Sequence, residues 1–172
     1  RVASFEVKSV NRTLRAKGRR KGDQTVSARL VKGDDDVILF TKQAFALRFP
    51  LADLSVTGVR TAGVRGINLK DDDHLVSLVA VREEENASLV LATQRGSAKR
   101  MNLREFEVAK RAQRGVVVLR VLQSNPHEVI GVEMATNDEI IVLATEKNHK
   151  IPILSGSLRL LNRISKGSFI AN

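Results

Sequence analysis

A fixed interval of 52 residues runs through this sequence and limits the folds that it can adopt. Segments 37–41, 89–93 and 141–145 read VILFT, LVLAT and IVLAT. The interval separates three leucines, three threonines and three glycines: Leu39, Leu91 and Leu143; Thr41, Thr93 and Thr145; Gly63, Gly115 and Gly167. A constant period of this length, kept without insertion, is typical of repeat architectures.

Each repeat contains up to four short strand-like segments. Apolar or alternating runs predict strands at 37–41, 45–49, 63–69 and 74–81, then at 89–93, 97–103, 115–122 and 127–134, and last at 139–145, 149–154 and 167–171. Two more strands are predicted at 4–10 and 24–31, whereas 103–112 predicts a loop or a single turn. Four short strands per unit indicate an all-β fold in which blades form a propeller-like array.

The blades are predicted to form one domain. Residues 1–36 would be a partial blade with a basic loop, 37–88 and 89–140 two blades, and 141–172 a partial last blade. Closed propellers need at least about four blades, so the array is incomplete or belongs to a longer chain, and we favour the longer chain. No charged-then-apolar leader begins at Arg1, so no signal peptide is expected.

Composition argues against several classes of function. The 172 residues are 42% hydrophobic, enough for a core, yet no window approaches 18 uninterrupted apolar residues, so no membrane partner is expected. The absence of cysteine excludes disulfides and thiolate metal sites. The three histidines, His74, His127 and His149, show no ligand spacing and are expected to be surface or turn residues, so no metal site is predicted.

No catalytic residues or cofactor sites are predicted on this chain. Acidic triplets at 34–36, 71–73 and 83–85 lie in predicted turns, do not follow a calcium-loop pattern, and are expected to be solvated. The sequence has no Walker-type loop and no strand-to-helix glycine motif. The spacing suggests no Ser/His/Asp arrangement.

The charge of the chain points to a polyanionic partner. Lysine and arginine number 29 against 19 acidic residues, and residues 1–22 alone hold eight basic side chains against one glutamate. Such an excess favours nucleic acid over a merely soluble basic surface. With no Trp, no Tyr and six Phe, the chain lacks the aromatic platforms that bind single strands, so duplex DNA is the expected target.

When the repeats are aligned, basic residues fall into four columns: Arg48 with Arg100, Arg95 with Lys147, Arg111 with Arg163, and Arg114 with Lys166. Charge at the same place on each blade would form a stripe that contacts phosphates without reading sequence. Outward strand positions that simply favour Lys or Arg would give the same recurrence. In the third copy, Pro152 takes the place of the first column's arginine.

Lys99 departs from its column, which otherwise holds Leu47 and Ile151. Either the lysine extends past the strand edge to reach solvent, or the register differs locally in the second repeat. Lys99 is counted among the predicted DNA contacts.

The sequence resembles the C-terminal domain of the bacterial type IIA topoisomerase A subunits. The resemblance rests on 91–100 (LATQRGSAKR), 58–69 (GVRTAGVRGINL) and 110–115 (KRAQRG), and covers most of residues 37–171. It implies a β-pinwheel, a propeller-shaped disc of about six blades whose rim binds and bends duplex DNA. Within the family, 125–127 (NPH) before an apolar strand and 167–170 (GSFI) look more like topoisomerase IV of Gram-positive type than gyrase.

The resemblance also implies partners and roles. The predicted DNA-binding set comprises Lys17, Arg19, Arg20, Lys21, Arg48, Arg60, Arg65, Arg95, Lys99, Arg100, Arg111, Arg114, Lys147, Arg163 and Lys166. The implied protein partners are an ATPase B subunit together with the rest of the A subunit, in a heterotetramer of the bacterial cytoplasm, close to the nucleoid. ATP and magnesium would be held on other domains. The family cleaves DNA with a tyrosine, and this chain has none, so it would be a non-catalytic part of an enzyme for strand passage, decatenation and supercoil relaxation.

Two alternatives stay open. The first is a gyrase DNA-wrapping domain, whose function requires a seven-residue box (QRRGGKG). The nearest segment here, 17–22 (KGRRKG), is basic and glycine-flanked but does not match, and is interpreted as a DNA-contact loop. The second is a propeller-type protein-interaction platform that docks an acidic partner domain.

Overall fold

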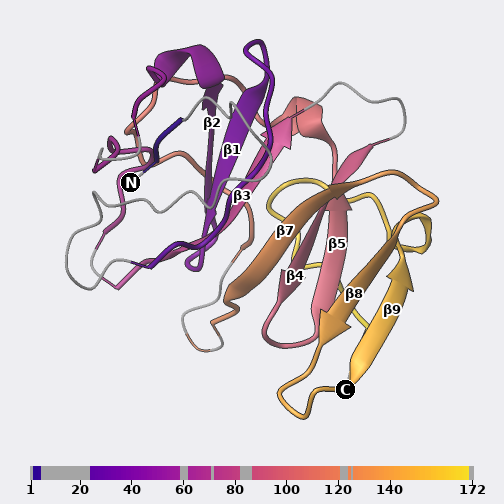
Figure 1. Cartoon of the computed structure of the whole chain (residues 1–172). Helices are drawn as coiled ribbons and strands as arrows, with labels where there is room; N and C mark the ends of the chain where they lie inside the picture. The colour runs from indigo at the N-terminus through magenta and orange to yellow at the C-terminus, as the bar shows by residue number, and fades with distance from the viewer. Residues whose placement is uncertain are drawn as a thin grey trace.

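The computed structural model describes residues 2–4, 24–58, 62–70, 72–81, 87–120, 124 and 126–170. In these residues the chain is all-β, with short antiparallel sheets arranged side by side as blades (Figure 1). The all-β, propeller-like fold predicted from the sequence is therefore confirmed. The strand predicted at 4–10 and the basic segment 17–22 lie, apart from Ser4, outside the described residues.

The first sheet has the strand order β3-β1-β2-β6. Its strands are β1 (Asp36–Thr41), β2 (Phe45–Pro50), β3 (Leu75–Val81) and β6 (Val116–Val117). The second sheet has the equivalent order β7-β4-β5-β10. Its strands are β4 (Ser88–Thr93), β5 (Ser97–Met101), β7 (Val129–Ala135) and β10 (Ser168–Phe169). The third pair is β8 (Ile140–Ala144) with β9 (Lys150–Leu154).

The 52-residue period is an exact structural register in the central hairpins. Leu39 faces Leu47, Leu91 faces Lys99, and Leu143 faces Ile151. A single 3-10 turn follows each hairpin, at Leu51–Asp53, Leu103–Glu105 and Ser155–Ser157. Equivalent sequence positions therefore occupy equivalent places in each blade.

Each four-stranded sheet takes its fourth strand from the following repeat. Strand β6 pairs with β2, and β10 pairs with β5, although each lies one repeat further along the chain. Gly115 and Gly167 precede these strands with φ of +84° and +87°, a conformation that favours glycine. A Cβ on Gly115 would lie 2.0 Å from the carbonyl oxygen of Ala46, so the close approach of the two repeats also requires glycine.

A continuous apolar core joins the first two sheets. It includes Phe40 of β1, Leu91 of β4, and Phe106, whose ring meets that of Phe40 edge-on at 5.9 Å between centroids. At the same contact between sheets, the Ser77 hydroxyl of β3 accepts a hydrogen bond from the backbone N–H of Val132 in β7. A separate core cluster, which includes Val90, Ala135 and Ile153, packs the second sheet against the β8–β9 pair.

Several strand predictions differ from the structure. Residues 24–31 alternate in sequence but form no strand. The long strand predicted at 63–69 is reduced to a single bridge at Val64. The described part of the strand predicted at 115–122, residues 115–120, contains only the two residues of β6. Their apolar residues are buried, Ile67 against the β1–β2 hairpin of its own repeat and Val118 in the core that joins the first two sheets. Their hydrophobicity therefore reflects burial rather than sheet pairing. The single turn predicted in 103–112 is confirmed at Leu103–Glu105.

Candidate nucleic-acid interface

The Arg48 and Arg100 column joins consecutive repeats. Nη1 of Arg48 donates to the carbonyl of Phe106 at 3.2 Å, and Nε of Arg100 donates to that of Leu158 at 2.8 Å. The two acceptors are themselves one period apart. Arg48 also contacts the Asp36 carboxylate through Nε and Nη2, both at 2.8 Å. Both arginines therefore clamp one repeat to the next, and the Arg48 guanidinium is held on two sides within the protein. Nη1 of Arg100 contacts the Asn137 side chain at an exposed position, so a DNA contact by this column stays a prediction.

The Arg111 and Arg163 column lies nearer the surface. Nη1 of Arg111 donates to the carbonyl of Arg65, and Nη1 of Arg163 donates to that of Val117, again with acceptors one period apart. Both side chains are half-buried. Each guanidinium keeps other N–H groups beyond this one bond, so both residues can still bind an anion.

The Arg114 and Lys166 column is the most open of those near the fourth strands. Arg114 lies over the ring of Phe45, with 3.8 Å from Cζ to the ring centroid. The equivalent of Phe45 is Ser97, whose hydroxyl donates to the carbonyl of Lys166 at 3.3 Å, and the Lys166 side chain is exposed. A hollow of about 220 Å³ lies beside Arg114, between β2 and segment 106–116.

Backbone hydrogen bonds align the segments that carry these residues. Ala112 N–H donates to Gly66, Asn68 N–H to Gln113, and Arg120 N–H to Ile164, each at 2.8 Å. The contacts form a continuous seam from segment 62–68 through 111–120 to 162–168. We call the basic residues on it the basic seam: Arg65, Arg111, Arg114, Arg120, Arg163 and Lys166. The predicted DNA-binding set does not include Arg120. That set was drawn largely from basic residues that recur with the period, and the equivalents of Arg120 are Asn68 and Asn172.

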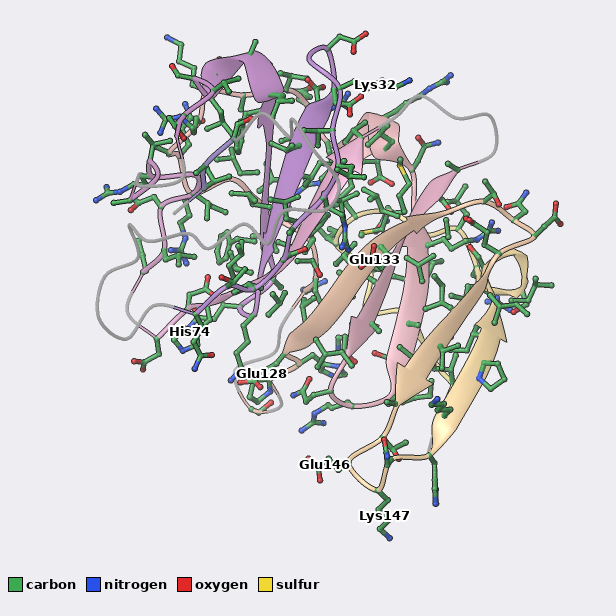
Figure 2. All side chains as sticks on the ribbon, viewed as in Figure 1. Lys32, His74, Glu128, Glu133, Glu146 and Lys147 are labelled. Carbon is green, nitrogen blue, oxygen red and sulfur yellow. The ribbon has the colours of Figure 1, made fainter. Side chains whose placement is uncertain are left out.

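The Arg95 and Lys147 column occupies the hairpin turns. Both side chains are exposed, and Figure 2 shows Lys147 at the tip of the β8–β9 turn, pointing away from the sheet. His127 is only 8% exposed, contrary to expectation, and its Nδ1 has no hydrogen-bond partner. Burial lowers the pKa of His127 below 6.5, and the charges of Arg95 and Lys166 lower it further. Arg95 belongs to the second repeat and Lys166 to the third, so basic residues of two repeats lie near His127.

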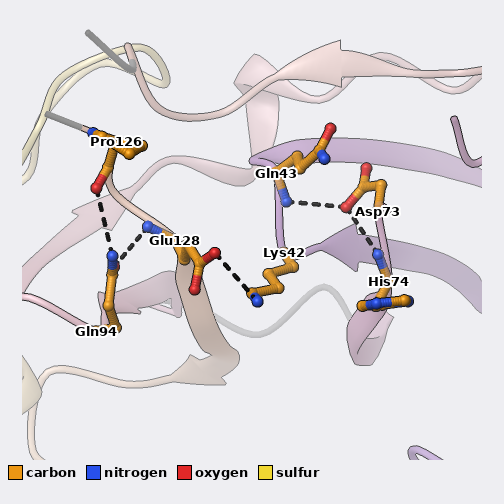
Figure 3. Close-up of polar contacts among 7 residues, drawn as sticks. All are labelled: Lys42, Gln43, Asp73, His74, Gln94, Pro126 and Glu128. Carbon is orange, nitrogen blue, oxygen red and sulfur yellow. Dashed lines mark hydrogen bonds and ion pairs between the residues drawn. The ribbon is translucent and has the colours of Figure 1, made fainter. Parts of the chain in front are cut away.

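A polar network fixes the turn ends of the first two repeats (Figure 3). The Asp73 carboxylate accepts hydrogen bonds from the N–H groups of Gln43 and His74, both at 2.9 Å. Lys42 pairs with Glu128 across the repeats at 3.1 Å. Asp73 is 3% exposed, so the expectation of solvated acidic triplets is wrong here, as it is for Asp36. These carboxylates hold turns and clamps in place.

Lys99 is fully buried, and its prediction as a DNA contact is wrong. Its Nζ donates to the carbonyls of Val118, Arg163 and Ser165 at 2.8, 2.5 and 2.7 Å, with a longer contact of 3.4 Å to Asn162. Its strand register matches that of Leu47 and Ile151, so neither explanation offered from the sequence holds. The ammonium is held in a cage of backbone carbonyls, and no phosphate can reach it.

Five predicted residues lie outside the described part of the chain: Lys17, Arg19, Arg20, Lys21 and Arg60. Among the described residues, no group of three or more His, Cys, Asp or Glu side chains could hold a metal ion. Within the same residues, no helix is long and apolar enough to cross a membrane.

Known proteins share this sequence pattern and this geometry. The sequence matches the family described as "DNA gyrase C-terminal domain, beta-propeller" over residues 35–82 and 87–136, more than half of its length. The chain belongs to this gyrase C-terminal domain family. It is 36% identical over 168 residues to the A subunit of DNA topoisomerase 4 from Bacillus subtilis (strain 168), covering 98% of this chain and 21% of that protein.

Two solved structures of the gyrase C-terminal domain family are similar to it. The C-terminal domain of DNA topoisomerase IV gives a TM-score of 0.78 at 44% identity, over 81% of this chain and 43% of the other. The DNA gyrase A C-terminal domain gives 0.74 at 25% identity, over 83% and 49%. The predicted family and its topoisomerase IV-like character are confirmed. The chain spans about a fifth of the curated relatives that it matches.

Proposed function

We propose that this chain is a non-catalytic module that binds and bends duplex DNA for a bacterial topoisomerase of the topoisomerase IV type. The observation that carries the proposal is the basic seam, whose arginines and lysine continue from one repeat to the next. A series of cations along a curved surface suits the phosphate backbone because each contact releases counterions and none requires a particular base.

The proposed parent enzyme supplies the chemistry. This chain contains no tyrosine, so strand cleavage would belong to the remainder of the A subunit. ATP and magnesium would be used on other domains, and the partner in the bacterial cytoplasm would be an ATPase B subunit. The module would orient the duplex for strand passage, decatenation and supercoil relaxation.

Bending DNA has an energetic cost that the seam must offset. A smooth bend of tens of degrees over a 20–30 base-pair site costs on the order of 1–6 kcal/mol. The side chains of the seam come from three successive segments, and the duplex is proposed to bend so that it meets them together. The greater identity to topoisomerase IV, 44% against 25% for gyrase A, favours this role over gyrase wrapping.

Salt dependence of duplex binding tests the proposal. The logarithm of the association constant should fall steeply against the logarithm of salt concentration, by about 0.9 per phosphate contact. Lys166→Ala and Arg114→Ala should each flatten the slope by about one unit. Arg104→Ala, at an exposed arginine that is not a member of the seam, is the matched control and should leave the slope nearly unchanged.

A flat slope for the unmodified chain would contradict the proposal. Tight binding of an acidic protein domain, without measurable DNA affinity, would support the interaction-platform alternative instead.

A further inference from the structure

The carbonyl cage around Lys99 exists because the second and third repeats meet in a different register from the first and second. Between the first two repeats, Gly66 and Gln113 carbonyls accept backbone N–H groups from Ala112 and Asn68. One period later, Arg120 N–H bonds Ile164 rather than Ser165. The Val118 and Ser165 carbonyls, which correspond to Gly66 and Gln113, are bound by Lys99 instead.

The cage orders a short loop. Three of the four carbonyls belong to residues 162–165, which also form a turn from Ser165 N–H to the Asn162 carbonyl at 3.1 Å. The Glu105 carboxylate accepts a hydrogen bond from the backbone N–H of Arg163 at 2.6 Å. A buried ammonium and a carboxylate, both from the second repeat, therefore hold one loop of the third.

This loop displays two members of the basic seam. Arg163 lies inside it, and the exposed Lys166 follows it directly. The cage leaves the DNA-facing atoms untouched but fixes the backbone from which both side chains extend. In the first repeat, Leu47 takes the place of Lys99, and no ammonium is needed there. The equivalent carbonyls, of Gly66 and Gln113, already accept backbone N–H groups.

We propose that Lys99 is a positioning residue for DNA binding: its buried ammonium holds loop 162–165 so that Arg163 and Lys166 meet the phosphates together. This inference rests on the proposed function and deepens it. Lys99 itself never touches DNA. Its contribution reaches the duplex only through the loop.

The protonation state of Lys99 offers a test that needs no substitution. Burial lowers the pKa of Lys99 to about 8; Glu105 opposes this and Arg163 adds to it. A neutral amine has two N–H donors in place of three and turns a lone pair toward a carbonyl. Duplex affinity of the 172-residue chain should therefore weaken from pH 7 to pH 9 with a midpoint near 8, at constant salt.

The substitution experiment uses Lys99→Met, alone and with Arg163→Ala/Lys166→Ala. Lys99→Met should weaken binding by about tenfold, remove the pH step near 8, and add almost nothing when both seam residues are already absent. Circular dichroism and amide exchange at 162–166 accompany each affinity, and the expected result is an intact sheet with faster exchange in the loop.

Three results would overturn the inference: unchanged affinity in Lys99→Met, full additivity with the seam substitutions, or a wild-type affinity that is flat across pH 8. If Lys99→Met does not fold, the pH titration of the unmodified chain decides alone. Failure of the proposed function looks different, because the unmodified chain would then show no salt-dependent duplex binding at any pH.

Discussion

At the scale of single residues, recurrence of an arginine does not identify its role. Arg48 and Arg163 both recur with the period, yet Arg48 is locked between Asp36 and the Phe106 carbonyl, while Arg163 lies on the basic seam. A repeat must present its partner surface and also attach to its neighbour. Both requirements select positively charged side chains at fixed positions, and only contacts distinguish them.

Arg48→Ala should destabilise the fold without changing the salt dependence of duplex binding. The substitution leaves the Asp36 carboxylate and the Phe106 carbonyl without a donor, so the free energy of unfolding should fall by about 1–3 kcal/mol. Urea denaturation measures the loss. The salt slope for duplex binding should stay at the wild-type value, and a slope reduced by a full unit would show that Arg48 contacts phosphate after all.

At the scale of elements, the short fourth strands connect the repeats. Strand β6 contributes only two residues to the first sheet, but its position there depends on Gly115, which combines a positive φ with close contact to Ala46. The strand-like sequence on either side is longer than the paired part because the chain leaves the sheet at once to cover the preceding repeat.

Gly115→Ala should lower the free energy of unfolding substantially, although it adds only one methyl group. The left-handed conformation costs an ordinary residue about 1–2 kcal/mol, and the added Cβ would also displace the Ala46 carbonyl. Thermal and urea unfolding should both show the loss. Gly131→Ala in β7 is the matched control: a Cβ there meets nothing within 4 Å, so its stability should stay equal or rise slightly. Equal losses for both variants would contradict this account of Gly115.

At the scale of the whole molecule, a sequence period is enough to predict the class of fold but not the contacts between copies. The hairpins around Leu39, Leu91 and Leu143 were predictable because apolar runs and turns are local features. The cage around Lys99 was not, since its acceptors lie 19 and 63–66 residues further along the chain. His127 was expected at the surface because nothing in its immediate sequence indicates that it is buried.

The chain carries a net charge of +10, and protonation of His127 would add to it. The effect of this protonation on folding stability should be measurable. The pKa of His127 in the folded chain is below 6.5, so as the pH falls through 6.5 the unfolded chain takes up a proton that the folded chain does not. Stability should therefore fall in this window, by at most about 1.4 kcal/mol per pH unit. In His127→Gln this contribution should vanish; identical pH profiles for the two proteins would refute it.

Because the fourth strand of each four-stranded sheet comes from the following repeat, the fold limits how repeats can be added to such a protein. Neither four-stranded sheet is encoded within a single 52-residue repeat, since the first needs residues from 36 to 117. A gene duplication that copied 52 codons would therefore extend the array in phase from any starting point, because every copy would supply a strand backward and receive one from ahead. A duplication whose length is not a multiple of this period would leave the sheet at the junction without its fourth strand. The interleaving thus restricts growth to whole periods, whichever residue the copy begins with.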